Sequence, residues 1–460
     1  MESVKVERGN LNNMDKQQGS RAYLIVICLV AATGGLLFGF DTAVISGAVG
    51  MFGAEFDLSA AMKGWAASSA LIGCMLGALT AGAASDRFGR KKLLLLAAVL
   101  FTGSSVWCGL AASVADLVRA RIMSGIAIGI ASMLSPMYIA EVSPPRLRGR
   151  LVSLQQFAII SGILAAYFSN ALILGTSLAE AAQWRWMFAV GAFPAAVFLL
   201  LLLFVPESPR WLLKQGRLES ARSVLTRVAG QAAAEAEIAS IRAAIAEEGG
   251  RLAELFRPGL RKALLVGVGL AILQQVTGIN AILYYAPEIF KSSGSAVGAA
   301  FNDTVWVGIF NMLFTFVAIA LIDRLGRKPL LLLGAAGMGL SLVLVGLAFH
   351  YELSGPWLLA LILCYVSSFA ASLGPVVWVV MSEIYPTRIR GRAMSVATVT
   401  LWGACYLVSQ TFLMMNEALG APLTFWTYAV LCVVTIVFVA AWVPETRGKT
   451  LEEIERSWTK

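Results

Sequence analysis

Long apolar stretches separated by short polar segments fill almost the whole chain after residue 21. A bilayer core is crossed by a helix of about 20 mostly apolar residues, and each stretch is long enough for that. The pattern predicts twelve membrane-spanning helices, at residues 22–46, 61–84, 93–113, 115–140, 151–175, 184–205, 261–289, 302–322, 329–350, 355–382, 393–415 and 423–443.

Composition agrees with this pattern. The 460 residues are 58% hydrophobic and 14% charged, whereas soluble domains carry about 25% charged residues. A water-soluble protein of this composition would expose far more apolar surface than monomers tolerate. We therefore expect an all-α integral membrane protein.

The polar segments divide the chain into five parts. Residues 206–260 mix Ala, Leu, Glu and Arg at helical spacing, which predicts a short helical insert joining two bundles. The expected parts are a disordered tail (1–21), a six-helix bundle (22–205), the insert (206–260), a second six-helix bundle (261–443) and a tail (444–460).

Basic residues collect in alternate loops, while the opposite loops contain little more than Lys63 and Lys291. The positive-inside rule places the basic loops in the cytoplasm, and with them the insert and both termini. The net charge of +9 is then a matter of topology and calls for no nucleic-acid partner. The basic loops contain Arg87, Arg90, Lys91 and Lys92; Arg146, Arg148 and Arg150; Arg324, Arg327 and Lys328; Arg388, Arg390 and Arg392.

Three motifs occur twice in the same order, separated by 237–242 residues. They are DRFGRKK (86–92) and DRLGRKP (323–329), EVSPPRLRGR (141–150) and EIYPTRIRGR (383–392), and PESPRW (206–211) and PETRGK (444–449). This repetition predicts two homologous halves with the same orientation. Parallel halves that rock against each other are a known transporter architecture.

These motifs carry a family resemblance. DRxGRK in each half resembles the signature of the major facilitator superfamily, and PESPRWL and PETRGKTLEEIE resemble those of its sugar porter family. QQVTGINAILYYAP (274–287) and GPVVWVVMSEIYPTRIRGR (374–392) are similar to that family's seventh and tenth helices. The resemblance covers residues 22–455, and it is especially close to xylose–proton symporters and related glucose and galactose carriers.

Sugar recognition needs amides that match hydroxyl groups, together with flat apolar surface for the C–H face of the ring. A single amide in a membrane helix is also explained by an interhelical hydrogen bond. The resemblance implies a sugar site formed by Gln156, Gln274, Gln275, Asn280, Asn311, Trp378 and Trp402, with Tyr284 and Tyr285 as gate residues or, alternatively, plain interfacial aromatics.

This chain departs from its relatives at the expected sugar site. Leu401 and Cys405 stand where close relatives carry amides, and Ile163 matches the glucose carriers rather than the xylose symporter. The expected pocket is therefore less polar, and the identity of the sugar stays open.

Asp41 interrupts the first apolar stretch. At about 1.5 Å per residue, Asp41 lies about 27 Å along the first helix and Arg121 about 9 Å into the fourth, which runs in the opposite direction. Both residues then lie in the outer third of the membrane and can pair. An ionisable residue in a membrane helix suggests a function, here proton coupling. A static ion pair is the alternative reading.

Charged motifs at the cytoplasmic helix ends suggest a latch. The family resemblance implies pairs of Glu141 with Arg148 and of Glu383 with Arg390. The alternative is that these charges only anchor helix ends and set topology. The expected latch comprises Asp86, Arg90, Glu141, Arg148, Glu207, Asp323, Arg327, Glu383, Arg390 and Glu445.

Together these features predict a monosaccharide–proton symporter of the inner membrane, working as a monomer by alternating access. An uncoupled sugar facilitator and a nontransporting sugar sensor are the alternatives. The sequence has no metal-binding cluster, nucleophile elbow or phosphate loop, so we expect no enzyme, metal or cofactor.

Overall fold

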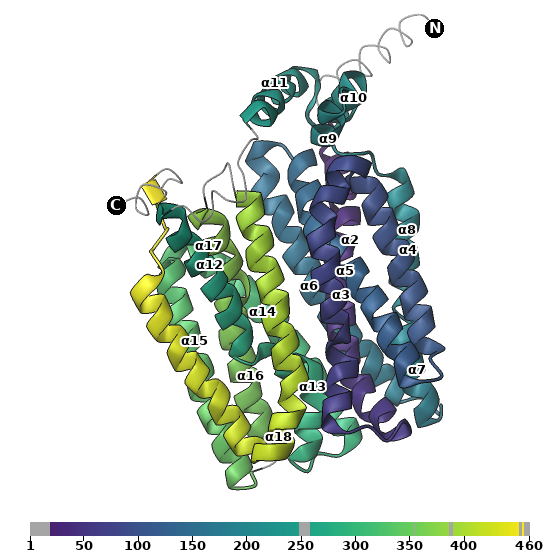
Figure 1. The fold of residues 1–460 in the computed structure, drawn as a ribbon, viewed down its shortest axis with the longest axis vertical. Helices are drawn as coiled ribbons and strands as arrows, with labels where there is room; N and C mark the ends of the chain where they lie inside the picture. The colour runs from purple at the N-terminus through teal and green to yellow at the C-terminus, as the bar shows by residue number, and fades with distance from the viewer. Residues whose placement is uncertain (1–18, 248–257, 354, 386–389, 450–452, 455–460) are drawn as a thin grey trace, which may run out of the picture.

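The computed structural model describes residues 19–247, 258–353, 355–385, 390–449 and 453–454, and every regular element in those ranges is a helix. Figure 1 shows two bundles side by side, α2–α8 and α12–α18, with α9–α11 at one end. The first bundle contains α2 (Arg21–Glu55), α3 (Ala60–Phe88), α4 (Arg90–Gly109), α5 (Val114–Val142), α6 (Pro145–Leu174), α7 (Glu180–Ala189) and α8 (Ala192–Phe204).

The connecting helices are α9 (Pro209–Lys214), α10 (Leu218–Ala229) and α11 (Gln231–Glu247). The second bundle contains α12 (Pro258–Val276), α13 (Ile279–Ser292), α14 (Val297–Leu325), α15 (Arg327–His350), α16 (Pro356–Ala370), α17 (Leu373–Ile384) and α18 (Arg390–Trp442). The end of the molecule that carries α9–α11 and the basic loops is called the basic end below, and the opposite end the far end.

Twelve membrane spans follow from these helices. Eleven apolar segments of the described chain are long enough to cross a bilayer, and the last of them is 52 residues long. Gly420 breaks α18 into two helices, because its φ of 79° and ψ of 162° are not helical. The prediction of an all-α membrane protein with twelve spans is confirmed.

The seventh span is broken, although the sequence predicts one helix over 261–289. Gly278 separates α12 from α13 in a left-handed conformation, with φ at 98°. A side chain there would be strained, and a Cβ would also lie 2.9 Å from the ring of Tyr428. The break falls between Gln275 and Asn280, so the two amides are presented by different helices.

Glycines bring the helices of the first bundle close together. A Cβ at Gly125 of α5 would lie 1.9 Å from the carbonyl oxygen of Ala70 on α3. A Cβ at Gly39 of α2 would lie 1.8 Å from the carbonyl oxygen of Ile159 on α6. Small residues permit such backbone contact in membrane helices. The pairs α3–α5 and α2–α6 can therefore pack closely, and Gly34 of α2 likewise lies against Ser135 of α5, the helix that carries Arg121.

The connecting helices form a small apolar core at the basic end. Leu225 of α10 packs with Ala234, Ile238 and Ile241 of α11. Of the predicted insert 206–260, residues 248–257 lie outside the described chain, as do residues 1–18 of the predicted N-terminal tail.

Candidate functional site

A cavity of about 2340 Å³ lies between the two bundles and opens at the basic end. Its wall reaches from Arg90, Glu141 and Arg148 at the basic end to Leu283 and Tyr284 in the interior. Both halves contribute, chiefly through α5 and α6 on one side and α12–α14, α17 and α18 on the other. A chamber of this size holds a hydrated small molecule with room to move.

All seven residues expected at the sugar site line this cavity. Gln274 is fixed by its Nε2, which donates to the carbonyl oxygens of Leu373 at 2.7 Å and Gly374 at 3.0 Å. Gln275 Nε2 donates to Gln274 Oε1 at 3.1 Å, and Asn280 Nδ2 donates to Gln275 Oε1. The structure thus places the three amides in one hydrogen-bonded row across the helix break.

The aromatic residue Trp402 offers a hydrogen-bond donor as well as an apolar surface. It is buried in the cavity wall and packs edge-on against Phe38, with ring centroids 5.2 Å apart. Its indole Nε1 has no hydrogen-bond partner in the described chain. A buried donor without a partner is costly, so a rearrangement that gives this N–H an acceptor would be favoured.

Sequence reasoning missed Gln155. This residue lines the cavity beside Gln156 and is 6% exposed, yet neither atom of its amide has a partner in the described chain. A helix turns about 100° per residue, so the adjacent residues Gln155 and Gln156 face different neighbours. Gln155 lies against Gly35 of α2, a contact that spacing in the sequence does not reveal.

The two expected gate tyrosines have different surroundings. Tyr284 lines the inner end of the cavity, whereas Tyr285 does not line it. Tyr285 Oη donates to the carbonyl oxygen of Ser409 at 2.7 Å, and its ring stacks on Phe412 at 5.3 Å. Tyr285 therefore joins α13 to α18 inside the second bundle.

Contacts between the two bundles close the far end of the cavity. Tyr167 Oη of α6 donates to the carbonyl oxygen of Leu283 on α13 at 2.8 Å. Ser68 Oγ of α3 donates to Gln410 Oε1 of α18 at 3.0 Å, and Gln410 Nε2 donates to the carbonyl oxygen of Ala61 at 3.0 Å.

Asp41 and Arg121 meet inside the first bundle. Arg121 Nη1 donates to Asp41 Oδ2 at 2.7 Å, and Nη2 donates to the carbonyl oxygen of Ala67 at 3.3 Å. Asp41 is 6% exposed and Arg121 is 1% exposed. Neither lines the cavity, although Thr42 and Tyr284 beside them do. Sequence reasoning missed a third partner, Ser124, whose Oγ donates to Asp41 Oδ1 at 3.1 Å.

The charged motifs form the same cluster in each half. Arg90 donates from Nε and Nη2 to the two oxygens of Glu141, both at 3.0 Å, and also contacts Asp86 at 3.3 Å. Glu207 accepts the backbone N–H groups of Arg90 at 3.0 Å and Lys91 at 3.2 Å.

In the second half Arg327 donates to Glu383 at 2.9 Å and contacts Asp323 at 3.1 Å. Glu445 accepts the backbone N–H groups of Arg327 at 3.1 Å and Lys328 at 3.0 Å. Each cluster therefore ties together helices of its own bundle.

The expected pair of Glu141 and Arg148 is wrong. Arg148 donates to the carbonyl oxygen of Ala140 at 2.9 Å and to Glu237 of α11 at 3.1 Å. Glu141 instead accepts from Arg90, which directly follows Gly89 (φ at 96°) at the start of α4, and α4 packs against α5. Glu383 likewise accepts from Arg327 and Thr446, and the side chain of Arg390 lies outside the described part.

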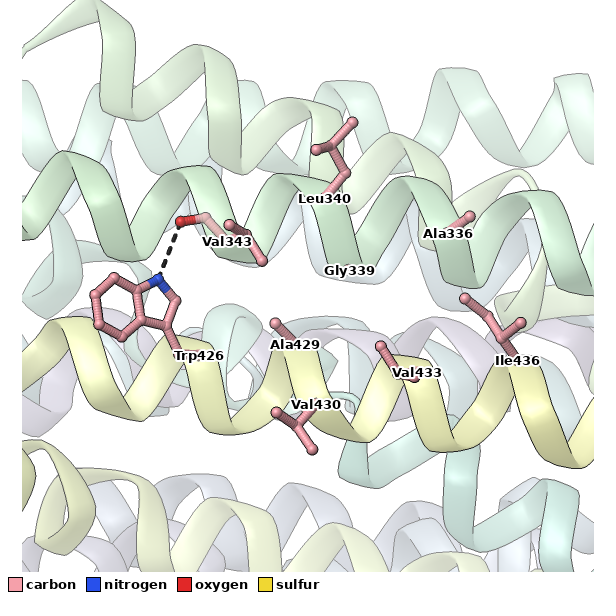
Figure 2. Close-up of a pocket in the computed structure, with 9 residues that line it drawn as sticks. All are labelled: Ala336, Gly339, Leu340, Val343, Trp426, Ala429, Val430, Val433 and Ile436. Atoms are coloured by element: carbon pink, nitrogen blue, oxygen red, sulfur yellow. Dashed lines mark hydrogen bonds between the residues drawn. The ribbon is translucent and has the colours of Figure 1, made fainter.

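A second pocket, of about 530 Å³, is an apolar groove between α15 and the end of α18 (Figure 2). The drawn side chains are almost all aliphatic, and Trp426 Nε1 donates to the carbonyl oxygen of Val343 at 3.1 Å. The groove lacks the polar groups that fix a sugar, so the cavity between the bundles is the candidate site.

Comparison with known proteins decides the family. A family model described as "Sugar (and other) transporter" matches residues 27–458. The chain belongs to this sugar transporter family. The resemblance found in the motifs is thereby confirmed.

Curated relatives cover nearly the whole of this sugar transporter. The arabinose–proton symporter of Bacillus subtilis (strain 168) is 45% identical over 446 residues, 96% of each chain. The D-xylose–proton symporter of Escherichia coli (strain K12) is 43% identical, covering 96% of this chain and 97% of the relative.

Solved structures share the fold. The xylose transporter from E. coli, in a partially occluded inward-open conformation, superposes with a TM-score of 0.85. It is 40% identical, and the match covers 93% of this chain and 100% of that chain. The predicted major facilitator fold is confirmed.

Proposed function

We propose that this sugar transporter is a monosaccharide–proton symporter that works by alternating access. The observation that carries the proposal is a buried carboxylate–guanidinium pair, Asp41 and Arg121, beside an amide-lined cavity between two homologous bundles. Curated relatives named as symporters for arabinose and xylose with protons support it.

The amide row is suited to a sugar because three side chains that can each donate and accept hydrogen bonds line one wall of the cavity. Gln274 is anchored to α17, Gln275 is held by Gln274, and Asn280 binds Gln275 from the other side of the helix break. A sugar that moves α13 therefore changes contacts at Gln275. Trp378 and Trp402 supply the apolar faces, and Gln156 and Asn311 extend the set from α6 and α14.

Proton coupling follows from the cost of breaking a buried ion pair. Protonation of Asp41 leaves Arg121 as a buried charge without its anionic partner, and loss of one partner costs about 3–5 kcal/mol. A rearrangement of α2 and α5 that offers Arg121 other acceptors lowers that cost. Because α2 packs against α13, a change at Asp41 also reaches the helix that carries Asn280 and Tyr284.

Orientation follows from charge. We assign the basic end to the cytoplasm, so both termini are cytoplasmic and the cavity is open inward. The bacterial relatives support a location in the inner membrane. One chain supplies both walls of the cavity, which supports a monomer as the working unit. The ion-pair clusters keep the cytoplasmic ends of each bundle rigid during rocking.

The test uses wild-type protein in proteoliposomes. A panel of unlabelled sugars competes with labelled arabinose, xylose, glucose and galactose, and the external pH is recorded during uptake. We expect the sugar that competes best to cause alkalinisation of the medium and to accumulate when an inward proton gradient is imposed. If the protein exchanges sugar but never accumulates it at any proton gradient, it is an uncoupled facilitator. If it binds sugar without transporting it, it is a sensor.

A further inference from the structure

We propose that Ser124 stays hydrogen-bonded to Asp41 whether or not the carboxyl group carries a proton, and that it thereby sets the pH range of coupled transport. The inference rests on the proposed proton coupling at Asp41. Ser124 is 2% exposed and lies one helical turn after Arg121 on α5, so both donors reach the carboxylate from the same helix.

The hydroxyl of Ser124 has two acceptors within reach. Its Oγ lies 3.1 Å from Asp41 Oδ1 and 3.0 Å from the carbonyl oxygen of Arg121. A serine hydroxyl has one proton to donate and also accepts hydrogen bonds. It can therefore donate to one of these two oxygens at a time.

The two distances allow an exchange of roles. While Asp41 is ionised, Ser124 donates to Oδ1 and Arg121 donates to Oδ2. When a proton binds at Oδ1, the Asp41 O–H donates to Ser124 Oγ, and the serine proton turns to the carbonyl oxygen of Arg121. The Asp41 carboxyl group and the Ser124 hydroxyl therefore stay hydrogen-bonded to each other in both states, although protonation still removes the anionic partner of Arg121.

Other titratable groups near Asp41 do not supply this hydrogen bond. Cys74 on α3, Cys108 on α4 and Tyr284 on α13 interact with it electrostatically. Thiols and phenols are ordinarily uncharged at neutral pH. Among the described residues that contact the Asp41 carboxylate, Arg121 is the charged one and Ser124 is the hydroxyl.

Ser124 affects the two protonation states unequally. A hydrogen bond to an ionised carboxylate is roughly twice as strong as one between neutral groups, so Ser124 favours the deprotonated form. Removal of the hydroxyl should let Asp41 keep its proton to higher pH. The alkaline limb of proton-driven uptake should then move upward by about half to one pH unit.

The experiment compares Ser124→Ala, Ser124→Thr and wild type in proteoliposomes. Initial rates of proton-driven uptake are measured against external pH at a fixed internal pH, and sugar exchange is measured in the same vesicles. We expect the half-maximal pH to rise in Ser124→Ala, to stay near the wild-type value in Ser124→Thr, and exchange to persist in both.

The matched control is Ser104→Ala on α4. Ser104 is also fully buried and donates to a carbonyl one turn back, that of Phe101 at 2.9 Å, but it does not contact Asp41. Its pH profile should coincide with that of wild type. If Ser124→Ala is not recovered from membranes, Ser124→Gly removes the same hydroxyl, and its pH profile is compared with wild type instead.

The role of Ser124 would be overturned if the pH profile of uptake in Ser124→Ala superposed on that of wild type. An equal shift of the half-maximal pH in Ser104→Ala would overturn it as well. Absence of proton-driven uptake in the wild type at every pH would instead refute the proposed symport. The two failures are therefore distinguishable.

Discussion

At the scale of single residues, the cavity wall combines a polar row with an apolar surface. Gln274, Gln275 and Asn280 form the row, while Ile163, Leu401 and Cys405 also line the cavity and offer few hydrogen bonds. A hydroxyl group facing the apolar surface would lose its water partners without full replacement. The cavity wall therefore has a polar and a less polar side.

Gln275→Ala should weaken sugar binding by about 2- to 13-fold, which corresponds to the loss of one hydrogen bond of about 0.5–1.5 kcal/mol. Gln275 is central to the row because it contacts both of the other amides. Equilibrium binding of the best sugar from the competition panel measures the effect. The control Gln183→Ala removes a buried amide of α7 that donates to the carbonyl oxygen of Leu178, and unchanged affinity in Gln275→Ala would exclude the row from the site.

At the scale of elements, the paired motifs build helix starts. Gly89 and Gly326 have φ values of 96° and 94°, and they directly precede α4 and α15. Glu207 and Glu445 then accept the first backbone N–H groups of these helices. A carboxylate is favourable at a helix N-terminus because it faces the positive end of the helix dipole. The glutamates of PESPRW and PETRGK therefore cap α4 and α15, which are the third and ninth spans. Each motif lies in the polar segment that follows the last helix of its own bundle.

Glu445→Ala should destabilise the second bundle by about 0.5–2 kcal/mol, the usual effect of losing an N-terminal cap. Burial raises the pKa of Glu445, but hydrogen bonds from the backbone N–H groups of Arg447, Arg327, Lys328 and Thr446 outweigh it and leave the pKa below its ordinary value of 4.5. Because the pKa of Glu445 is lower in the folded than in the unfolded protein, the ionised carboxylate stabilises the fold at pH values above the unfolded-state pKa. This stabilisation is lost as the pH falls through the folded-state pKa.

Thermal unfolding in detergent at several pH values measures this effect. The difference between wild type and Glu445→Ala should be full at pH 7 and shrink at pH values under about 4.5. Glu417→Ala, at an exposed position, is the control and should leave the melting temperature unchanged. A difference that grows on acidification would contradict the capping role.

The sequence predicted the spans, the repeat and seven residues of the cavity wall because these depend on apolar length and on motifs. Helical rise placed Asp41 and Arg121 at a similar depth, where they can pair, and the structure shows that they do. The sequence did not predict the partner of Glu141, because that partner comes from α4, which packs against α5, and not from the motif that contains Glu141. The break at Gly278 and the contact of Ser124 likewise depend on packing between helices.

At the scale of the whole molecule, the two bundles touch at the far end and part at the basic end. Tyr167, Ser68 and Gln410 hold the closed side together with a few hydrogen bonds. Asp86, Arg90, Glu141 and Asp323 of the ion-pair clusters line the open side, and each cluster is paired within its own bundle. Rocking the bundles then requires few bonds to break, and proton binding at Asp41 can bias it.

The most direct test of the account is Asp41→Asn, measured for net accumulation and for exchange in the same proteoliposomes. The substitution keeps the size of the side chain but removes its titration, and some loss of stability is expected because Arg121 loses its anionic partner. Sugar-induced alkalinisation and accumulation driven by a proton gradient should vanish, while exchange of labelled for unlabelled sugar, which needs no net proton movement, should persist. If Asp41→Asn still concentrates sugar against its gradient, Asp41 is a structural ion-pair partner and the symport mechanism is contradicted.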